Sequence, residues 1–281
     1  MNLNRCPVCA SKDARPHKTI LREYDSVRYA LDVRKCADCG LVYLGILPSV
    51  SYDETYLVLE SVITLENEFS RFHAEERIAE IAGIVAPAGK RFLDVGIGDG
   101  LILSFAERAG YNTFGLDVNP AGVERALKHY NLKANISLEP PERSFVGQTF
   151  DVIHMNEVIE HVTDPMPLLR WCRERLNRDG RIIIQTGNID SLAAKLKGDD
   201  WDYIRPVHAI YFSSSTLKAT LSRAGFATES VRTIDWRFIA AMQHASRLFK
   251  KHGLRPSIKF LLLYLTAVVP GIRRATVIYA K

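Results

Sequence analysis

Nine residues decide the fold of this chain: Phe92-Leu93-Asp94-Val95-Gly96-Ile97-Gly98-Asp99-Gly100. An apolar run ends at this cluster of glycines, and a helical pattern follows over 101–109 and stops at Gly110. The order predicts a strand, a tight turn and a helix. The three glycines lack the Cβ atoms that would hold a ligand away from the backbone, and they tolerate positive φ. The turn therefore presents the free N–H groups of a helix N-terminus to a ligand.

The next apolar segment, 111–118, carries an acid, Asp117, near its end. In sheets of this kind, an acid at the tip of the second strand holds the two hydroxyls of a ribose. The spacing predicts an adenosine-type ligand, either a dinucleotide or S-adenosylmethionine. Asp94, two residues before Gly96, favours the second, because a carboxylate repels a pyrophosphate but suits a cationic sulfonium and ammonium.

The motif from Leu93 to Gly100 resembles the first motif of class I S-adenosylmethionine-dependent methyltransferases, and Asp117 resembles the ribose-binding acid of their next motif. The resemblance implies an α/β fold with a doubly wound, seven-stranded, mostly parallel sheet. The cofactor-binding residues that we assign are Asp94, Gly96, Gly98, Asp117, Leu138, Glu139 and Asn156, with Leu138 and Glu139 beside the adenine.

Strand and helix patterns alternate along the predicted methyltransferase domain, 69–281, which predicts a parallel sheet. Right-handed crossovers then bring the C-terminal strand ends to one rim, where ligands bind. Helices are expected at 69–85, from Asn119-Pro120, from Asp164-Pro165 to Asn177, and from Ser213 to Gly225. Strands are expected at 91–95, 111–118, 132–138, 150–155, 181–186, 226–234 and 275–280.

Two C-x-x-C knuckles lie in the N-terminal region, 1–47, and consist of Cys6, Cys9, Cys36 and Cys39. This pattern, with short strands between and after the knuckles, predicts a zinc ribbon whose closed four-thiolate site serves folding and not catalysis. A redox pair and four reduced thiols are the alternatives. The region also resembles the front of deoxysugar C-methyltransferases, but these usually carry a further C-terminal domain, which we do not expect here. The fifth cysteine, Cys172, is expected in the core.

Glu157, Glu160 and His161 follow the strand at 150–155. They can supply a base or a divalent-metal site, and the Glu-x-x-Glu-His pattern resembles ubiquinone-biosynthesis O-methyltransferases, where such a cluster has been linked to a metal. Alternatively, the carboxylates stabilise a helix start and the histidine only lines the cofactor cleft.

The segment 201–212 is too aromatic for a plain loop and too broken for a helix, and we assign it to the acceptor site. His208 is the first candidate for the general base and His161 the second. A structural histidine is the alternative for His208. The pattern Pro206-x-His208-x-x-Tyr211-Phe212-Ser213 resembles a branch of these enzymes that modifies glycans and natural products, over about residues 70–281.

The composition is ordinary for a globular protein, with 281 residues, 47% hydrophobic residues and a net charge of +5. No dense basic stripe is present, so we expect no nucleic-acid partner. No signal peptide precedes the first knuckle, which predicts a cytoplasmic protein. Residues 48–68 are expected to connect the two parts and to form a candidate lid. An insert is expected at 238–270, and its apolar part, 256–270, predicts a buried helix, a homodimer face or a peripheral membrane contact that would suit a lipid-linked acceptor.

The sequence thus predicts a methyltransferase that uses S-adenosylmethionine and structural zinc to methylate a hydroxyl oxygen of a glycan or other small molecule. Sugar C- or N-methylation is the nearest alternative. An NAD-dependent oxidoreductase and a non-catalytic module that docks through its zinc ribbon are the alternatives from other classes.

Overall fold

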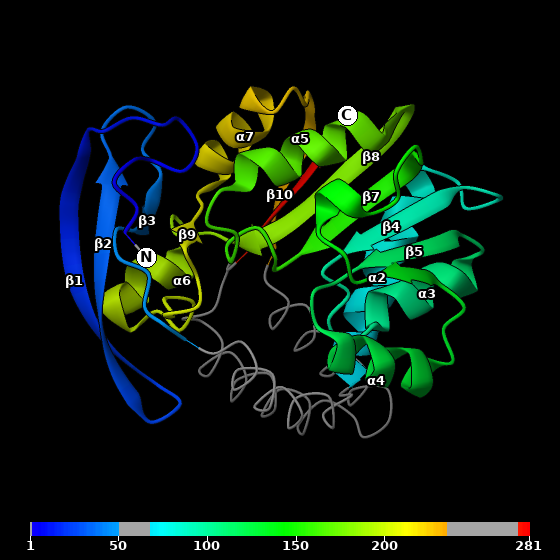
Figure 1. Ribbon diagram of the computed structural model, residues 1–281, viewed down its shortest axis with the longest axis horizontal. Coiled ribbons are helices and arrows are strands. Elements are labelled where there is room, and N and C mark those ends of the chain that lie inside the picture. Colours follow the sequence, from blue (N-terminus) through cyan, green and yellow to red (C-terminus); the bar gives the residue numbers. More distant parts are fainter. Residues whose placement is uncertain (1, 51–67, 235–274) are drawn as a thin grey trace, which may run out of the picture.

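The structure is a computed structural model that describes residues 2–50, 68–234 and 275–281 (Figure 1). Most of the predicted connector at 48–68 and all of the predicted insert at 238–270 lie outside the described residues. The predictions of a lid, a dimer face and a membrane contact therefore remain predictions. No helix within the described ranges is long and apolar enough to cross a membrane.

The larger sheet has seven strands among the described residues: β4 (Arg91–Val95), β5 (Asn112–Leu116), β6 (Asn135–Ser137), β7 (Phe150–Asn156), β8 (Leu176–Gly187), β10 (Thr228–Ile234) and β11 (Ala275–Ala280). Their order across the sheet is β10-β11-β8-β7-β4-β5-β6. β4 to β8 run parallel, whereas β11 is antiparallel to both β8 and β10. The predicted doubly wound, Rossmann-like sheet is confirmed.

Helices cover both faces of this sheet (Figure 1). They are α2 (Glu68–Ile84), α3 (Leu101–Ala109), α4 (Pro120–Tyr130), α5 (Pro165–Arg175) and α7 (Ser214–Arg223). Helix α6 (Leu192–Lys197) lies instead beside the N-terminal strands, and η1 (Pro141–Arg143) and η2 (Gly198–Asp200) are short 3-10 turns. Successive strand residues point to opposite faces. Leu93 and Ile153 accordingly pack with α5 and α7, whereas their neighbours Phe92 and Val152 pack with α2, α3 and α4.

Three predicted helix starts are confirmed by their caps. The side-chain oxygens of Asn119, Asp164 and Ser213 accept backbone N–H groups two or three residues further along, which satisfies donors that a helix start leaves free.

Several predicted boundaries differ from the structure, and those of β6 and β8 differ most. β6 is shorter than 132–138, because Leu132 N still donates to Leu127 O at the end of α4. β8 begins at Leu176 and not at Arg181, so residues 176–180 belong to the strand. Phe150 pairs with Leu176 and Val152 pairs with Arg181, so the chain between must bulge out of register.

The smaller sheet is built from β1 (Ala14–Tyr24), β2 (Val27–Cys36), β3 (Val42–Leu44) and β9 (Ile210–Tyr211), in that order. β9 belongs to the predicted acceptor segment, and it pairs antiparallel with β3. The ribbon core of Leu31 and Val33 packs with Trp201 and Ile204 of the same segment. The N-terminal ribbon is therefore packed onto the larger domain through the segment 201–212.

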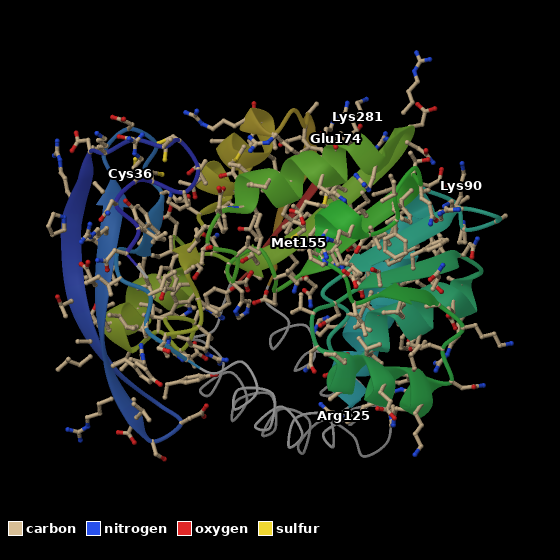
Figure 2. All side chains as sticks on the ribbon, viewed as in Figure 1. Cys36, Lys90, Arg125, Met155, Glu174 and Lys281 are labelled. Carbon is tan, nitrogen blue, oxygen red and sulfur yellow. The ribbon has the colours of Figure 1, made fainter. Side chains whose placement is uncertain are left out.

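The C-terminal ends of the parallel strands face the ribbon. Figure 2 labels Lys90, just before β4, at the side away from the ribbon, and Met155, near the end of β7, towards the ribbon residue Cys36. The rim where ligands bind in such sheets thus lies between the sheet and the ribbon.

Candidate functional site

The turn after β4 has Gly96 and Gly98 at positive φ, +74° and +53°. A Cβ at Gly96 would lie 2.4 Å from Val158 Cγ2, so a side chain there requires the neighbour to move. A Cβ at Gly98 would meet nothing within 4 Å. The turn therefore leaves open space beside its backbone, where a ligand can approach.

Asp117 follows β5 and is held beside this turn. Its Oδ2 accepts the N–H of Gly98 at 3.3 Å, and its Oδ1 accepts the N–H of Asn119 at 2.9 Å. Each carboxylate oxygen keeps a further lone pair, so two fixed acceptors remain for neighbouring hydroxyl groups.

Exposed apolar side chains lie at the ends of β5 and β6. Val118 is 73% exposed and Leu138 is 45% exposed, while the adjacent Glu139 forms an ion pair with Arg143 on η1. Exposed apolar groups on neighbouring strand ends suit the face of an aromatic base. Val118 was missed by the sequence reasoning, although an apolar residue directly after a strand-end acid is a readable signal.

Asp94 is buried and faces a histidine. Its Oδ1 lies 2.7 Å from His154 Nδ1 on the neighbouring strand β7, and only 2% of Asp94 is exposed. Burial raises the pKa of Asp94, and the His154 contact partly offsets this. His154 was not assigned from the sequence, because a single histidine inside an apolar strand gives no signal of its partner.

A pocket of about 240 Å³ opens beside this pair, between α2, the start of α3 and the ends of β7 and β8. Its polar lining includes His73, Arg77, Asp99, His154, Asn156 and Gln185. Asn156 is the assigned cofactor residue that the structure brings into this wall.

Arg77 is a charged residue of this pocket that was not assigned from the sequence. It is 4% exposed, and its guanidinium donates to Tyr279 OH (2.8 Å), Gln185 Oε1 (2.8 Å) and Glu80 Oε2 (3.0 Å). A guanidinium fixed in a pocket wall suits a carboxylate ligand. The available signal was an arginine inside the apolar helical stripe at positions 74, 78 and 81.

His73 on the same helix makes stability depend on pH. Burial, followed by the charge of Arg77, lowers the pKa of His73 from 6.5 to about 3. Because the unfolded chain binds this proton more readily, the contribution is complete above pH 6.5 and is lost as the pH falls from 6.5 towards 3. His73→Gln is expected to flatten the fall in thermal midpoint between pH 7 and pH 5. His129→Gln, on the exposed side of α4, is the control, and an unchanged slope in His73→Gln would refute this assignment.

A second cluster lies beyond the ends of β7 and β8, centred on Glu160, which is fully buried. Its Oε2 accepts from Thr186 Oγ1 at 2.9 Å and its Oε1 accepts from Tyr203 OH. Its backbone carbonyl accepts the N–H groups of Ala209 (2.8 Å) and Ile210 (3.1 Å). The end of β7 is thereby tied to the segment 201–212.

The two histidines assigned as bases lie together, with ring centroids 4.6 Å apart. His161 Nδ1 donates to Val207 O at 3.0 Å, and His208 Nδ1 donates to Tyr203 O at 2.8 Å. In the neutral rings, both Nε2 atoms therefore carry lone pairs. Burial, followed by His161, lowers the pKa of His208 well below its usual value, so its ring is neutral. One ligand atom from each histidine and from Glu160 lie within 4.8 Å of one another.

Glu157 connects the pocket with this cluster. It has a positive φ of 53°, a strained conformation for a non-glycine residue, and its N–H donates to Gln185 O at 2.9 Å. Burial, followed by the adjacent Glu160, raises the pKa of Glu157 well above its usual value. Paired carboxylates at the edge of a pocket are typical of functional sites.

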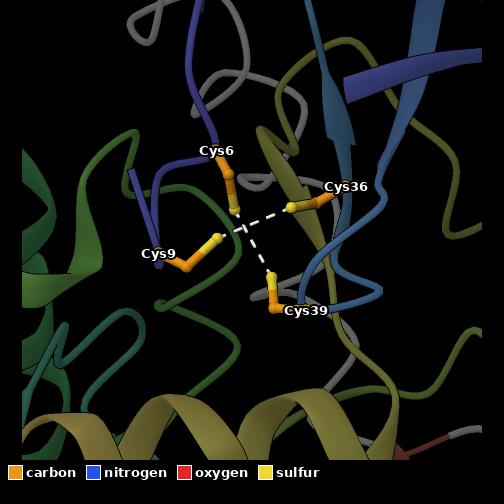
Figure 3. Close-up of side chains that lie close together, drawn as sticks. All are labelled: Cys6, Cys9, Cys36 and Cys39. Atoms are coloured by element: carbon orange, nitrogen blue, oxygen red, sulfur yellow. Dashed lines mark hydrogen bonds between the residues drawn. The ribbon is translucent and has the colours of Figure 1, made fainter. Parts of the chain in front are cut away.

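The four cysteines of the knuckles point at one another (Figure 3). Sγ atoms are 3.5 Å apart for Cys6 and Cys39 and for Cys9 and Cys36, and all four lie within 4.8 Å. The sulfur of the first cysteine in each knuckle accepts backbone N–H groups two and three residues on. Zn–S bonds of about 2.3 Å in a tetrahedron fit such spacings. Cys172 is separate and buried in α5, as expected.

Both knuckles close with a left-handed residue, but only one of these is glycine. Ala10 has φ +59° and Gly40 has φ +73°, and each donates its N–H to the first cysteine's carbonyl. Because an L-residue in this region costs about 1 kcal/mol, Ala10→Gly is expected to raise the free energy of unfolding by about that amount. Gly40→Ala, whose Cβ would meet nothing within 4 Å, is the matched reverse change and should lower it similarly. Denaturant unfolding measures both, and equal stability of all three proteins would contradict the strain argument.

The fold and the strand-end site are those of a class I S-adenosylmethionine-dependent methyltransferase. Residues 67–231, more than half of the chain, match the model of the methyltransferase domain family, and the chain belongs to this family.

Ubiquinone biosynthesis O-methyltransferases are among its relatives. The one from Cereibacter sphaeroides (strain ATCC 17025) is 32% identical over 120 residues, which are 40% of this chain and 48% of the relative. The one from Bordetella avium is 25% identical over 222 residues, 71% of this chain and 91% of the relative. The chain thus spans about half the length of the first relatives that it matches.

Solved structures share the fold. The plantazolicin methyltransferase BpumL in complex with SAH superimposes with a TM-score of 0.56 at 20% identity, over 82% of this chain and 91% of that one. The [4+2]-cyclase SpnF superimposes with a TM-score of 0.52 at 17% identity, over 74% and 80%. Since a cyclase shares the fold, these likenesses say nothing about the acceptor.

Proposed function

We propose that this methyltransferase transfers a methyl group to a hydroxyl oxygen of a small organic acceptor held between the strand ends and the segment 201–212. The observation that carries the proposal is the cluster of Glu160, His161 and His208 directly beyond the pocket. Glu157 and Gln185 join the two, so a donor in the pocket and an acceptor at the cluster would be neighbours.

The cofactor's residues follow from the geometry described above. Asp117 would accept hydrogen bonds from the ribose hydroxyls, and Val118 and Leu138 would flank the adenine. The open space beside the Gly98 backbone would receive the part of the cofactor that faces this turn. Arg77 would bind the α-carboxylate. When bound, S-adenosylmethionine supplies a methyl group on a cationic sulfur, which needs no further activation.

The residues around the acceptor would remove its proton and orient its oxygen. Nε2 of His208 or of His161 takes the hydroxyl proton, and the buried carboxylate of Glu160 stabilises the positive charge that this creates. Orientation of the acceptor oxygen by the segment 201–212 supplies much of the rate enhancement. Proton transfer to a positioned base typically adds about 10²- to 10⁴-fold.

The same three side chains fit a divalent cation as a second arrangement. Glu160, His161 and His208 offer one carboxylate oxygen and two imidazole nitrogens within 4.8 Å. Such a ligand set suits Zn²⁺, Fe²⁺ or Mn²⁺. A bound cation would lower the pKa of an acceptor hydroxyl.

A zinc ion in the four-cysteine site is the other cofactor that we propose. The sulfur spacings and the backbone N–H donors to sulfur support it. Four protein ligands leave no open position, so zinc would serve folding.

Oxygen is preferred over carbon or nitrogen because relatives at 25–32% identity are named O-methyltransferases. The experiment is methyl transfer from isotope-labelled S-adenosylmethionine to three groups of acceptors: hydroxylated aromatic compounds, sugars and amines. Mass spectrometry and NMR of the product then locate the methyl group, with and without a chelator followed by added Mg²⁺, Mn²⁺ or Zn²⁺. A methyl ether is the expected product. A product methylated on carbon or nitrogen would overturn the proposal, and restoration of rate by a cation would favour the second arrangement.

A further inference from the structure

Asp94 and His154 form a pair that lies where β4 and β7 run in parallel register. Both residues are almost fully buried, with 2% and 1% exposed. The ring of His154 stacks on Phe92 at a centroid distance of 5.9 Å, so it is held on both its edge and its face. With Asp94 ionised, Nδ1 carries the proton that it donates to the carboxylate, and Nε2 keeps a lone pair.

His154 lines the pocket proposed for the cofactor, and its Nε2 is the ring nitrogen that does not contact Asp94. This nitrogen makes no hydrogen bond within the described part of the chain. An imidazole nitrogen that opens into a pocket can accept a hydrogen bond from a ligand there. The guanidinium of Arg77 lines the same pocket. The pocket therefore combines a fixed cation with an acceptor backed by a carboxylate, which suits a zwitterionic amino-acid group.

We propose that His154 Nε2 accepts a hydrogen bond from the α-ammonium of the cofactor's methionine part, and that Asp94 acts through His154 as a positioning residue. The proposal rests on the proposed cofactor site. His154 lines the pocket whereas Asp94 does not, and Oδ1 of Asp94 already accepts from His154 Nδ1. An ammonium beside the imidazole would stabilise the carboxylate whose pKa burial raises.

The test uses three probes of the same pocket: S-adenosylhomocysteine, its analogue without the α-amino group, and 5′-methylthioadenosine, which lacks the whole amino-acid part. Wild-type protein is expected to prefer S-adenosylhomocysteine over the deaminated analogue by about 10- to 100-fold, the usual effect of a hydrogen bond to a charged group. His154→Asn keeps a polar group near Nδ1 for Asp94 but withdraws from the pocket. In this variant the preference should disappear, while the affinities for the other two probes stay unchanged.

Two further variants separate recognition from structure. His154→Gln places an amide near the position of Nε2 and should restore part of the preference, whereas Asp94→Asn should reduce it. Asp117→Ala should lower the affinity for all three probes together, because Asp117 would bind the ribose that they share. An unchanged preference in His154→Asn, or an equal loss of all three probes, would overturn the proposal. Failure of the wild type to bind any probe would overturn the cofactor site and this proposal with it.

Discussion

Removal of the zinc ion that we propose for the four-cysteine site is expected to abolish methyl transfer and to lower the thermal midpoint sharply, while S-adenosylhomocysteine still binds. Zinc contributes about 10–16 kcal/mol to the folding of small zinc-finger peptides, which is as large as the ~5–15 kcal/mol of a whole domain. Without it, the knuckles lose the interaction that closes them, and β2 and β3 lose their anchor at Cys36.

The loss of structure should reach the cluster of Glu160, His161 and His208 through backbone hydrogen bonds. β3 pairs with β9 through Val42 and Tyr211, and Leu44 N donates to Ala209 O at 2.9 Å. Ala209 N in turn donates to Glu160 O at 2.8 Å. The pocket proposed for the cofactor is lined by α2, α3, β7 and β8 of the larger domain, so its ligand should remain bound.

Chelator treatment and Cys9→Ser should give the same result, measured as zinc per chain, thermal midpoint, S-adenosylhomocysteine affinity and rate of methyl transfer. Cys172→Ala is the matched control, because Cys172 lies outside the cluster, and it should keep one zinc per chain. Zinc-free protein that retains its rate and thermal midpoint would show that the ribbon does not hold the acceptor segment.

Glu160→Gln is expected to lower kcat by about 10²- to 10³-fold with little change in KM for S-adenosylmethionine. The substitution keeps the size of the buried side chain but removes the charge that would stabilise a protonated histidine or bind a cation. The hydroxyl of either Thr186 or Tyr203 can turn to accept from the new amide N–H while the other still donates to the amide oxygen, so the fold should survive.

Thr186→Val is the control for this prediction. It removes a hydrogen bond to Glu160 Oε2 but leaves the carboxylate charge in place, and a much smaller decrease in kcat is expected. Equal decreases in both variants would mean that Glu160 acts only as a hydrogen-bonding anchor. An equal rise in KM for S-adenosylmethionine would move its role from the acceptor to the cofactor.

The sheet could be predicted because its signals are local. The glycine turn, the acid at Asp117 and the caps at Asn119 and Asp164 each depend on residues within a few positions of one another. The knuckle cysteines are equally local in pairs.

The missed features depend on contacts between distant segments. β9 is only two residues long and becomes a strand because β3 offers it a partner. His154 meets Asp94 because β7 and β4 are neighbours in a particular register, which periodicity does not fix. Arg77 lies on α2 and is held in the pocket wall by a hydrogen bond to Tyr279, about 200 positions later in the sequence.

Calorimetric titration with S-adenosylhomocysteine, with NAD as the comparison ligand and Asp117→Ala as the variant, tests the cofactor site directly. We expect that S-adenosylhomocysteine binds, that NAD does not, and that Asp117→Ala loses most of the affinity because both ribose hydroxyls lose their acceptor. Binding of NAD alone, or full affinity in Asp117→Ala, would contradict the placement of the cofactor across the strand ends.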